Sequence, residues 1–181
     1  MRITGRILGL LTLFLVAVGP ALAEKSEITF AIGGGIFKPT DSATKDKFDD
    51  TWTRISFTTF EPNKTNKWRF ISEGGKYNLD GGTSDVSLYP ISFGYERGFG
   101  EDNNVRPYVV LRAGPYYGQL KDDTLGIDDK HIGLNTNMSL GLVFSRRYYL
   151  EARYDYFSKL AGYDFSGFSI YAGMKLFTVK L

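Results

Sequence analysis

Residues 132–144 read IGLNTNMSLGLVF, and their side chains alternate between two kinds. Every second residue from Ile132 to Phe144 is apolar except Thr136, whereas the residues between them are small or polar except Val143. Alternation with a period of two predicts a β-strand with two unlike faces. The segment is about twice as long as the usual strand of a soluble protein. The fold therefore depends on which of the two faces meets water.

The first 23 residues have the parts of a secretory signal peptide. Arg2 and Arg6 precede an apolar run over residues 7–18, and the segment ends in Ala-Leu-Ala at 21–23. The run is too short to span a bilayer as a stable helix and has no basic flank on its C-terminal side, which disfavours the alternative of a membrane anchor. We therefore expect residues 1–23 to be a cleaved signal peptide and residues 24–181 to form one exported domain.

The composition of the mature chain excludes several classes of protein. The full sequence has a formal net charge of +2, and removal of Arg2 and Arg6 brings that charge to zero. A neutral chain without a basic run is not expected to bind nucleic acid. The sequence has no cysteine and one histidine, so it offers neither disulfides nor the ligands of a zinc site. We expect no cofactor and no metal centre.

Eight segments of the mature chain share the alternation and are separated by turn-forming residues. In chain order they cover residues 27–37, 51–60, 68–79, 89–97, 106–118, 132–144, 148–157 and 168–176. The connections after the first, third, fifth and seventh segments are on average longer and richer in Asp than the others. Connections that alternate in this way are typical of a meander with both termini at one end. The predicted fold is all-β, an eight-stranded antiparallel up-and-down transmembrane β-barrel.

The composition of the two faces indicates that the apolar one points outward, toward lipid. The polar face consists mostly of Gly, Ser, Asn and Tyr with scattered charges, whereas a face in water is expected to carry many Lys and Glu. The other face has no ionisable residue in the clearest strands and has aromatic residues near several strand ends, as membrane barrels do. A secreted soluble ligand-binding barrel, with the two faces exchanged, is the alternative.

Charged side chains on the polar face are then expected inside the barrel. The interior of an eight-stranded barrel is just wide enough for its own side chains, and a buried charge persists only when it is paired. We therefore expect a structural polar network that closes the lumen and leaves no channel of porin width. Its predicted members are Arg112, Glu151, Arg153, Asp155 and Lys175.

Four segments resemble the strands of a known group of proteins. ITFAIGGGIFKPTDS (28–42), LYPISFGYERGF (88–99), RPYVVLRAGPYYG (106–118) and FSIYAGMKLF (168–177) look like the first, fourth, fifth and last strands of small eight-stranded outer-membrane proteins. This group contains the OmpW-like, OmpX/Ail-like and OmpA-barrel-like proteins. The resemblance implies an integral protein of the cell outer membrane in a Gram-negative envelope. It also implies contact with outer-membrane lipids and lipopolysaccharide and insertion by the outer-membrane assembly machinery, and it leaves any surface partner unidentified.

His131 is the residue to consider for catalysis, because some barrels of similar fold modify lipid A. The lipid A deacylases among them carry a His and a Ser two residues apart on one strand face, and here Gly133 stands at that position. His131 therefore has no hydroxyl nucleophile within its strand, and we expect no catalytic residue. Asp pairs at 49–50, 122–123 and 128–129 are interpreted as solvated loop charges rather than as a site for a hard cation.

The expected function is that of a non-enzymatic outer-membrane barrel with a structural, surface-interaction or lipid-contacting role. Three alternatives stay open. The first is an OmpW-like conduit for small hydrophobic compounds, the second is a lipid A-modifying enzyme, and the third is the soluble ligand-binding barrel.

Overall fold

The computed structural model describes residues 27–60, 68–80, 83–100, 104–124 and 126–180. The predicted signal peptide, residues 1–23, lies outside the described residues. In this part of the chain, α2 (Ser42–Phe48) is the one helix, and no helix there is long and apolar enough to cross a membrane.

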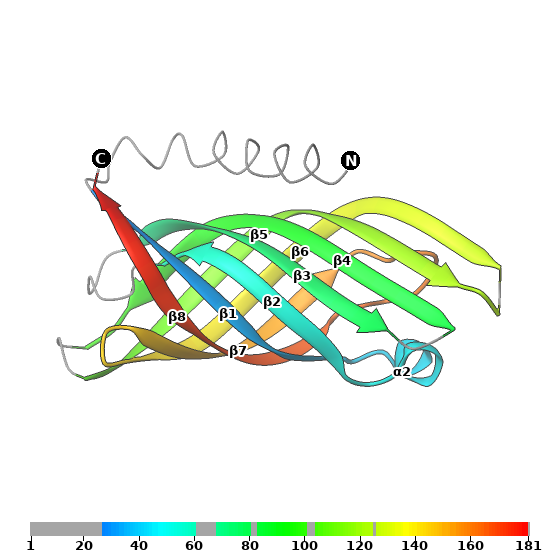
Figure 1. Ribbon diagram of the computed structural model, residues 1–181, viewed down its shortest axis with the longest axis horizontal. Helices are drawn as coiled ribbons and strands as arrows, with labels where there is room; N and C mark the ends of the chain where they lie inside the picture. Colours follow the sequence, from blue (N-terminus) through cyan, green and yellow to red (C-terminus); the bar gives the residue numbers. More distant parts are fainter. Residues whose placement is uncertain (1–26, 61–67, 81–82, 101–103, 125, 181) are drawn as a thin grey trace.

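Eight antiparallel strands form a closed barrel in which each strand pairs with its neighbours in the sequence, and β1 closes the ring against β8 (Figure 1). The predicted fold class is therefore confirmed. The strands are β1 (Glu27–Pro39), β2 (Trp52–Thr59), β3 (Arg69–Asp80), β4 (Ser84–Gly98), β5 (Val105–Asp122), β6 (Ile127–Phe144), β7 (Tyr148–Phe157) and β8 (Gly167–Lys180). Closure leaves the sheet with no free edge around the ring, which is how a strand satisfies its backbone groups in lipid.

The two ends of the barrel differ in their connections. At the α2 end lie α2, the β3–β4 and β5–β6 connections and the long β7–β8 connection, whereas β1 begins and β8 ends at the other, which we call the turn end. At the turn end, β6 and β7 are joined by residues 145–147, in which Ser145 and Arg146 have positive φ and the amide of Arg147 donates to the carbonyl of Phe144 at 3.0 Å. Residues 144–147 thus form a tight β-turn with positive φ at both central residues, a turn whose twist suits paired strands.

One predicted connection is wrong. We expected residues 121–130 to form a loop, but β5 continues to Asp122 and β6 starts at Ile127, so both strands have 18 residues. Pairing runs without a break from Val105↔Phe144 to Asp122↔Ile127. The sequence of this part is polar, and the apolar alternation therefore stops before the strands do. Backbone hydrogen bonds between the two strands do not require an apolar face, which explains why the ladder extends further.

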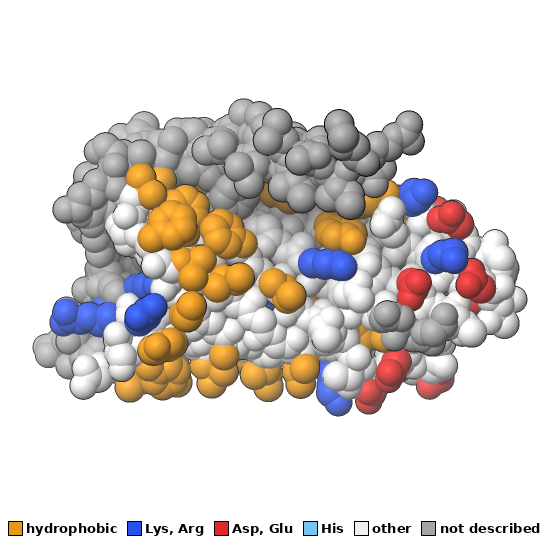
Figure 2. Space-filling model, viewed as in Figure 1, with side chains coloured by type: hydrophobic (Ala, Val, Ile, Leu, Met, Phe, Trp, Pro, Cys, Tyr) orange, Lys and Arg blue, Asp and Glu red, His pale blue; other side chains and the backbone are white. Residues whose placement is uncertain are grey.

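The predicted orientation of the two faces is confirmed. Leu140 points outward with 60% of its surface exposed, and its neighbour Ser139 points inward with 1% exposed. The same holds along β7, where every second residue is buried. Figure 2 shows hydrophobic side chains over the middle of the outer surface, between ends that carry charged groups.

The lumen is filled in three layers. A cluster at the α2 end, which we call the aromatic plug, contains Phe37, Phe48, Trp52, Tyr77, Leu79, Val86, Leu88, Tyr116, Leu120, Phe157, Leu160 and Phe165. A second apolar cluster, toward the turn end, contains Ala31, Phe60, Ile71, Tyr108, Val110, Val143, Tyr149 and Tyr171. Buried arginines and acids lie in the lumen as well. The lumen is thus less polar than the alternation indicated, because large aromatic side chains occupy many inward positions.

Candidate functional site in the lumen

Arg153 on β7 is the centre of the charged layer. Its guanidinium binds Glu73 on β3 through two bonds, Nη1 to Oε1 at 2.5 Å and Nη2 to Oε2 at 2.7 Å. It also donates to Oε1 of Glu151, from Nε at 3.0 Å and from Nη2 at 2.8 Å. β3 and β7 are not neighbours in the ring, so these bonds cross the lumen. Parallel bonds from a planar guanidinium to a carboxylate are among the strongest that side chains form.

Two further arginines share the same carboxylates. Nη2 of Arg54 on β2 lies 2.9 Å from Oε1 of Glu73, and Nη2 of Arg112 on β5 lies 3.4 Å from its other oxygen. Arg112 is also 3.7 Å from Glu151 and donates to the side-chain oxygen of Asn137 at 3.3 Å. All five charged groups, the three arginines and the two glutamates, are buried. Opposite charges in such a space stabilise one another, and removal of one leaves the others unpaired.

Tyrosines complete the charged layer. The hydroxyl of Tyr171 on β8 donates to Glu151 at 2.6 Å and accepts from Arg153 at 2.5 Å, and the hydroxyl of Tyr108 donates to the second oxygen of Glu151 at 2.8 Å. The guanidinium of Arg54 lies 3.9 Å from the centre of the Tyr171 ring. Such stacking places a cation on the negative face of an aromatic ring.

The five predicted members of the network do not all lie in the charged layer. Arg112, Glu151 and Arg153 lie together in the charged layer. Asp155 is at its border, 4.0 Å from Arg153, and accepts from Ser169 at 3.2 Å. Lys175 is half-buried, with its ammonium group 5.7 Å from the centre of the Phe60 ring in the second apolar cluster.

The alternation did not identify several groups of the layer: Glu73, Tyr108 and Tyr171, which bind Arg153 or Glu151, and Arg54, which binds Glu73. Glu73 lies in the third segment, residues 68–79, where the alternation of apolar and polar residues is weak. Like Glu151, the two tyrosines stand at positions whose side chains alternate into the lumen. This alternation was the signal that could have identified them.

Glycines in the wall make room for these rings. A Cβ on Gly141 would overlap the ring of Tyr108, and one on Gly33 would meet the hydroxyl of Tyr149 and the ring of Tyr171. Glycine in a strand often marks such a close approach. The small residues of the inward face therefore set where the aromatic groups of the lumen can lie.

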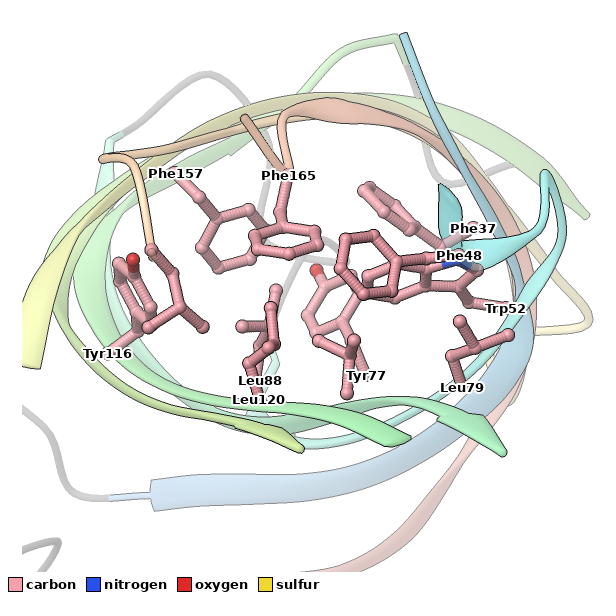
Figure 3. Close-up of a cluster of buried hydrophobic side chains, with 12 residues drawn as sticks. Phe37, Phe48, Trp52, Tyr77, Leu79, Leu88, Tyr116, Leu120, Phe157 and Phe165 are labelled. Atoms are coloured by element: carbon pink, nitrogen blue, oxygen red, sulfur yellow. The ribbon is translucent and has the colours of Figure 1, made fainter. Parts of the chain in front are cut away.

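The aromatic plug is built partly from connections (Figure 3). The β7–β8 connection brings Phe165 to within 5.4 Å of Trp52 and 5.7 Å of Phe48, between ring centres. α2 is held there by two contacts: the hydroxyl of Thr44 donates to the carbonyl of Asp164 at 2.8 Å, and Lys47 lies 2.9 Å from the buried carboxylate of Asp122. Figure 3 shows the rings of the plug pointing into the barrel from several sides.

Asp41 caps the N-terminus of α2. Its side chain accepts from the amide of Thr44 at 2.8 Å and from the Thr44 hydroxyl at 3.0 Å. The hydrogen bond from the Thr44 amide, and then that from its hydroxyl, lowers the pKa of Asp41 below its usual value, because both bonds favour the ionised carboxylate. The cap satisfies an amide that the short helix itself leaves without a partner.

His131 is exposed and lies on β6 toward the α2 end of the barrel. Its ring centre is 6.5 Å from that of Tyr116, and Gly133 follows two positions on. The Ser158 hydroxyl, which a Cβ on Gly133 would meet, accepts from the backbone amide of Leu134 at 2.9 Å. Among the described residues, no group of three or more His, Cys, Asp or Glu side chains is arranged to hold a metal ion.

No protein-family model and no curated protein sequence matches the chain. Solved structures do. The Neisserial surface protein A, NspA, superposes with a TM-score of 0.61 at 18% identity, over 87% of this chain and 98% of NspA. Ail, the attachment invasion locus protein of Yersinia pestis, gives 0.54 at 18% identity, over 84% of this chain and 99% of Ail. The outer membrane enzyme PagL gives 0.56 at 13% identity, over 81% of this chain and 99% of PagL.

These likenesses show the fold. The chain has the fold of small eight-stranded outer-membrane barrels, and the resemblance to the OmpX/Ail and OmpA-barrel group is confirmed at that level. A surface protein, NspA, and an outer membrane enzyme, PagL, share this fold, so the fold alone assigns no activity.

Proposed function

We propose that the chain is an integral barrel of the cell outer membrane, exported through a cleaved signal peptide, with a structural, surface-interaction or lipid-contacting role and no catalysis. The observation that carries this proposal is the exposed apolar band around a lumen filled with paired charges. Among the described residues, twenty-four large hydrophobic side chains are exposed, Ile132, Leu140 and Ile170 among them. A band of this kind is a liability in water and a requirement in a bilayer.

The filled lumen supports a closed barrel over a conduit. The charged layer crosses the lumen between β3 and β7, and apolar clusters lie toward both ends. An OmpW-like conduit for small hydrophobic compounds needs a continuous path past these groups. Lipids and lipopolysaccharide around the outer band, and the assembly machinery that inserts the barrel, are the partners that this proposal includes.

The decisive experiment compares two substitutions on the outer surface. Leu140→Arg places a charge in the middle of the apolar band and should cost about 2 to 4 kcal/mol of stability in a bilayer. Gln119→Arg is the matched control, because Gln119 lies beside Asp85, Lys121 and Lys130 in the polar part of the outer surface. Folding in lipid vesicles is followed by the faster gel migration of the unheated barrel.

Equal folding of the two variants in lipid contradicts the membrane proposal and favours the soluble barrel. Extraction of the wild-type chain from envelopes without detergent has the same meaning. We expect instead that only Leu140→Arg reduces the folded fraction and that detergent is required.

The enzyme alternative is tested separately, because PagL, which has a similar fold, is an outer membrane enzyme. The observation against it is that Gly133, which lacks a hydroxyl, stands two positions after His131. His131→Ala should therefore leave the mass spectrum of lipid A from expressing cells unchanged relative to the wild-type chain. A lipid A modification that appears with the wild-type chain and vanishes in His131→Ala contradicts the non-enzymatic proposal.

A further inference from the structure

The two ends of the barrel carry opposite charge. The α2 end has ten aspartates against six lysines in its connections and the strand residues beside them: Asp41, Asp46, Asp49, Asp50, Asp85, Asp122, Asp123, Asp128, Asp129 and Asp164, with Lys38, Lys45, Lys47, Lys121, Lys130 and Lys159. At the turn end the described basic side chains are Arg69, Arg97, Arg106, Arg146, Arg147 and Lys175, and the described acid is Glu96. On the face drawn in Figure 2, acidic side chains gather at the α2 end and basic ones lie at both ends.

The connections outside the described residues do not reverse this balance. By sequence, residues 61–67 contain two lysines and one glutamate, and residues 101–103 contain one glutamate and one aspartate. The turn end is therefore basic overall. Because the mature chain has no net charge, the negative charge at one end of the barrel balances the positive charge at the other.

Two arginines at the turn end are held against aromatic rings. The guanidinium of Arg97 lies 6.0 Å from the ring centre of Trp68 and 5.5 Å from that of Phe99, and the guanidinium of Arg147 lies 5.9 Å from that of Tyr148. The three rings are exposed by 48%, 39% and 51%, respectively. Aromatic rings of this kind lie at the level of lipid headgroups in membrane barrels. The stacking therefore keeps both cations at that level.

We propose that this basic aromatic collar, made of Arg97 and Arg147 with Trp68, Phe99 and Tyr148, binds the anionic headgroups of phospholipids in the adjoining leaflet. A guanidinium matches a phosphate with paired N–H donors while its flat face stays on an aromatic ring. The apolar band begins beside the collar, with exposed Tyr95 and Leu111 next to Trp68. A headgroup at the collar can thus keep its acyl chains on the band, which a soluble anion cannot do. This inference rests on the proposed membrane location.

The test uses the detergent-solubilised wild-type barrel and native mass spectrometry with equal amounts of phosphatidylglycerol and phosphatidylethanolamine. We expect a preference for phosphatidylglycerol in the wild-type chain. A basic residue near an anionic lipid surface changes binding by about five-fold, so Arg97→Gln/Arg147→Gln should reduce the preference by at least that factor. High salt should reduce it in the same direction, because the cations are partly exposed.

The matched control removes two cations from the acidic end. Lys38→Gln/Lys121→Gln deletes exposed lysines that pair with Asp50 and Asp123, and it should leave the phosphatidylglycerol preference unchanged. An unchanged preference in the arginine variant, or an equal loss in the lysine variant, overturns the inference while the membrane proposal stands. A chain that stays soluble without detergent overturns both. The gel shift of the unheated sample verifies that each variant is folded.

Discussion

The charged layer and the aromatic plug are both buried inside the barrel, but they are built in opposite ways. The charged layer consists of arginines, acids and tyrosines that all come from strands. The plug is apolar, and three of its members, Phe48, Leu160 and Phe165, come from α2 or the β7–β8 connection. The strand register fixes the first set, whereas the second set depends on how the connections fold back into the barrel mouth.

This difference separates global from local stability. Side chains on paired strands cannot leave the charged layer unless the ladder of the barrel opens. The connections at the α2 end can move while every strand stays paired, because few backbone bonds hold them, such as that from the amide of Thr40 to the carbonyl of Ser166 at 2.8 Å. Elements held in this way open at lower free energy than the core. We therefore expect the plug to open without unfolding of the barrel.

The largest effect is expected for Arg153→Ala. It removes the guanidinium that hydrogen-bonds to both Glu73 and Glu151, and Arg112, the other group near both buried carboxylates, lies farther from them, at 3.4 and 3.7 Å. Breaking a buried ion pair in this way costs about 3 to 5 kcal/mol. The midpoint temperature of the gel shift in detergent should fall, and any variant that remains folded should show more small-ion conductance in planar bilayers than the wild-type barrel.

Arg147→Ala is the control for this prediction, because the exposed β6–β7 turn should tolerate the same substitution within about 0.5 kcal/mol. Equal midpoints for the two variants show that the charged layer does not hold the barrel together. A large and steady conductance of the wild-type barrel contradicts the closed lumen and favours the conduit alternative.

Phe165→Ala should have a smaller and local effect. The side chain is fully buried between Phe48 and Trp52, and removal of a buried Phe side chain costs about 3 kcal/mol at the lower end of the usual range. We expect this loss of stability to make the plug open more easily, as measured by Trp52 fluorescence in a Trp68→Phe background. The gel-shift midpoint should change little. Phe168→Ala, which removes an outward ring that is 59% exposed, should change neither signal. If both signals shift together in Phe165→Ala, the plug and the barrel unfold as one unit.

The two regions also differ in how far the sequence predicted them. Alternation identified all eight strands and the inward parity of Glu151 and Arg153, because a period of two is a local property of the chain. It did not identify Arg54 or Glu73 as partners, since which strands face each other across a lumen depends on the closure of the ring. α2 was also missed: seven residues are too few for a helical period, and the cap at Asp41 is the only local signal.

The smallest effect is expected at the cap of α2. Asp41→Ala removes the acceptor of both bonds from Thr44, so the helix should fray and the plug should open a few-fold more often. Asp41→Asn keeps an acceptor and serves as the control.

The lowered pKa of Asp41 means that its contribution is complete above the usual value of 3.8 and is lost as the pH falls through the lower, folded value. The positive charges of Lys159 and Lys45 act in the same direction on the pKa of Asp41. Acid should therefore reproduce the Asp41→Ala change in Trp52 fluorescence in the wild-type chain but not in Asp41→Asn, and an equal acid response of both chains assigns the titration to another group.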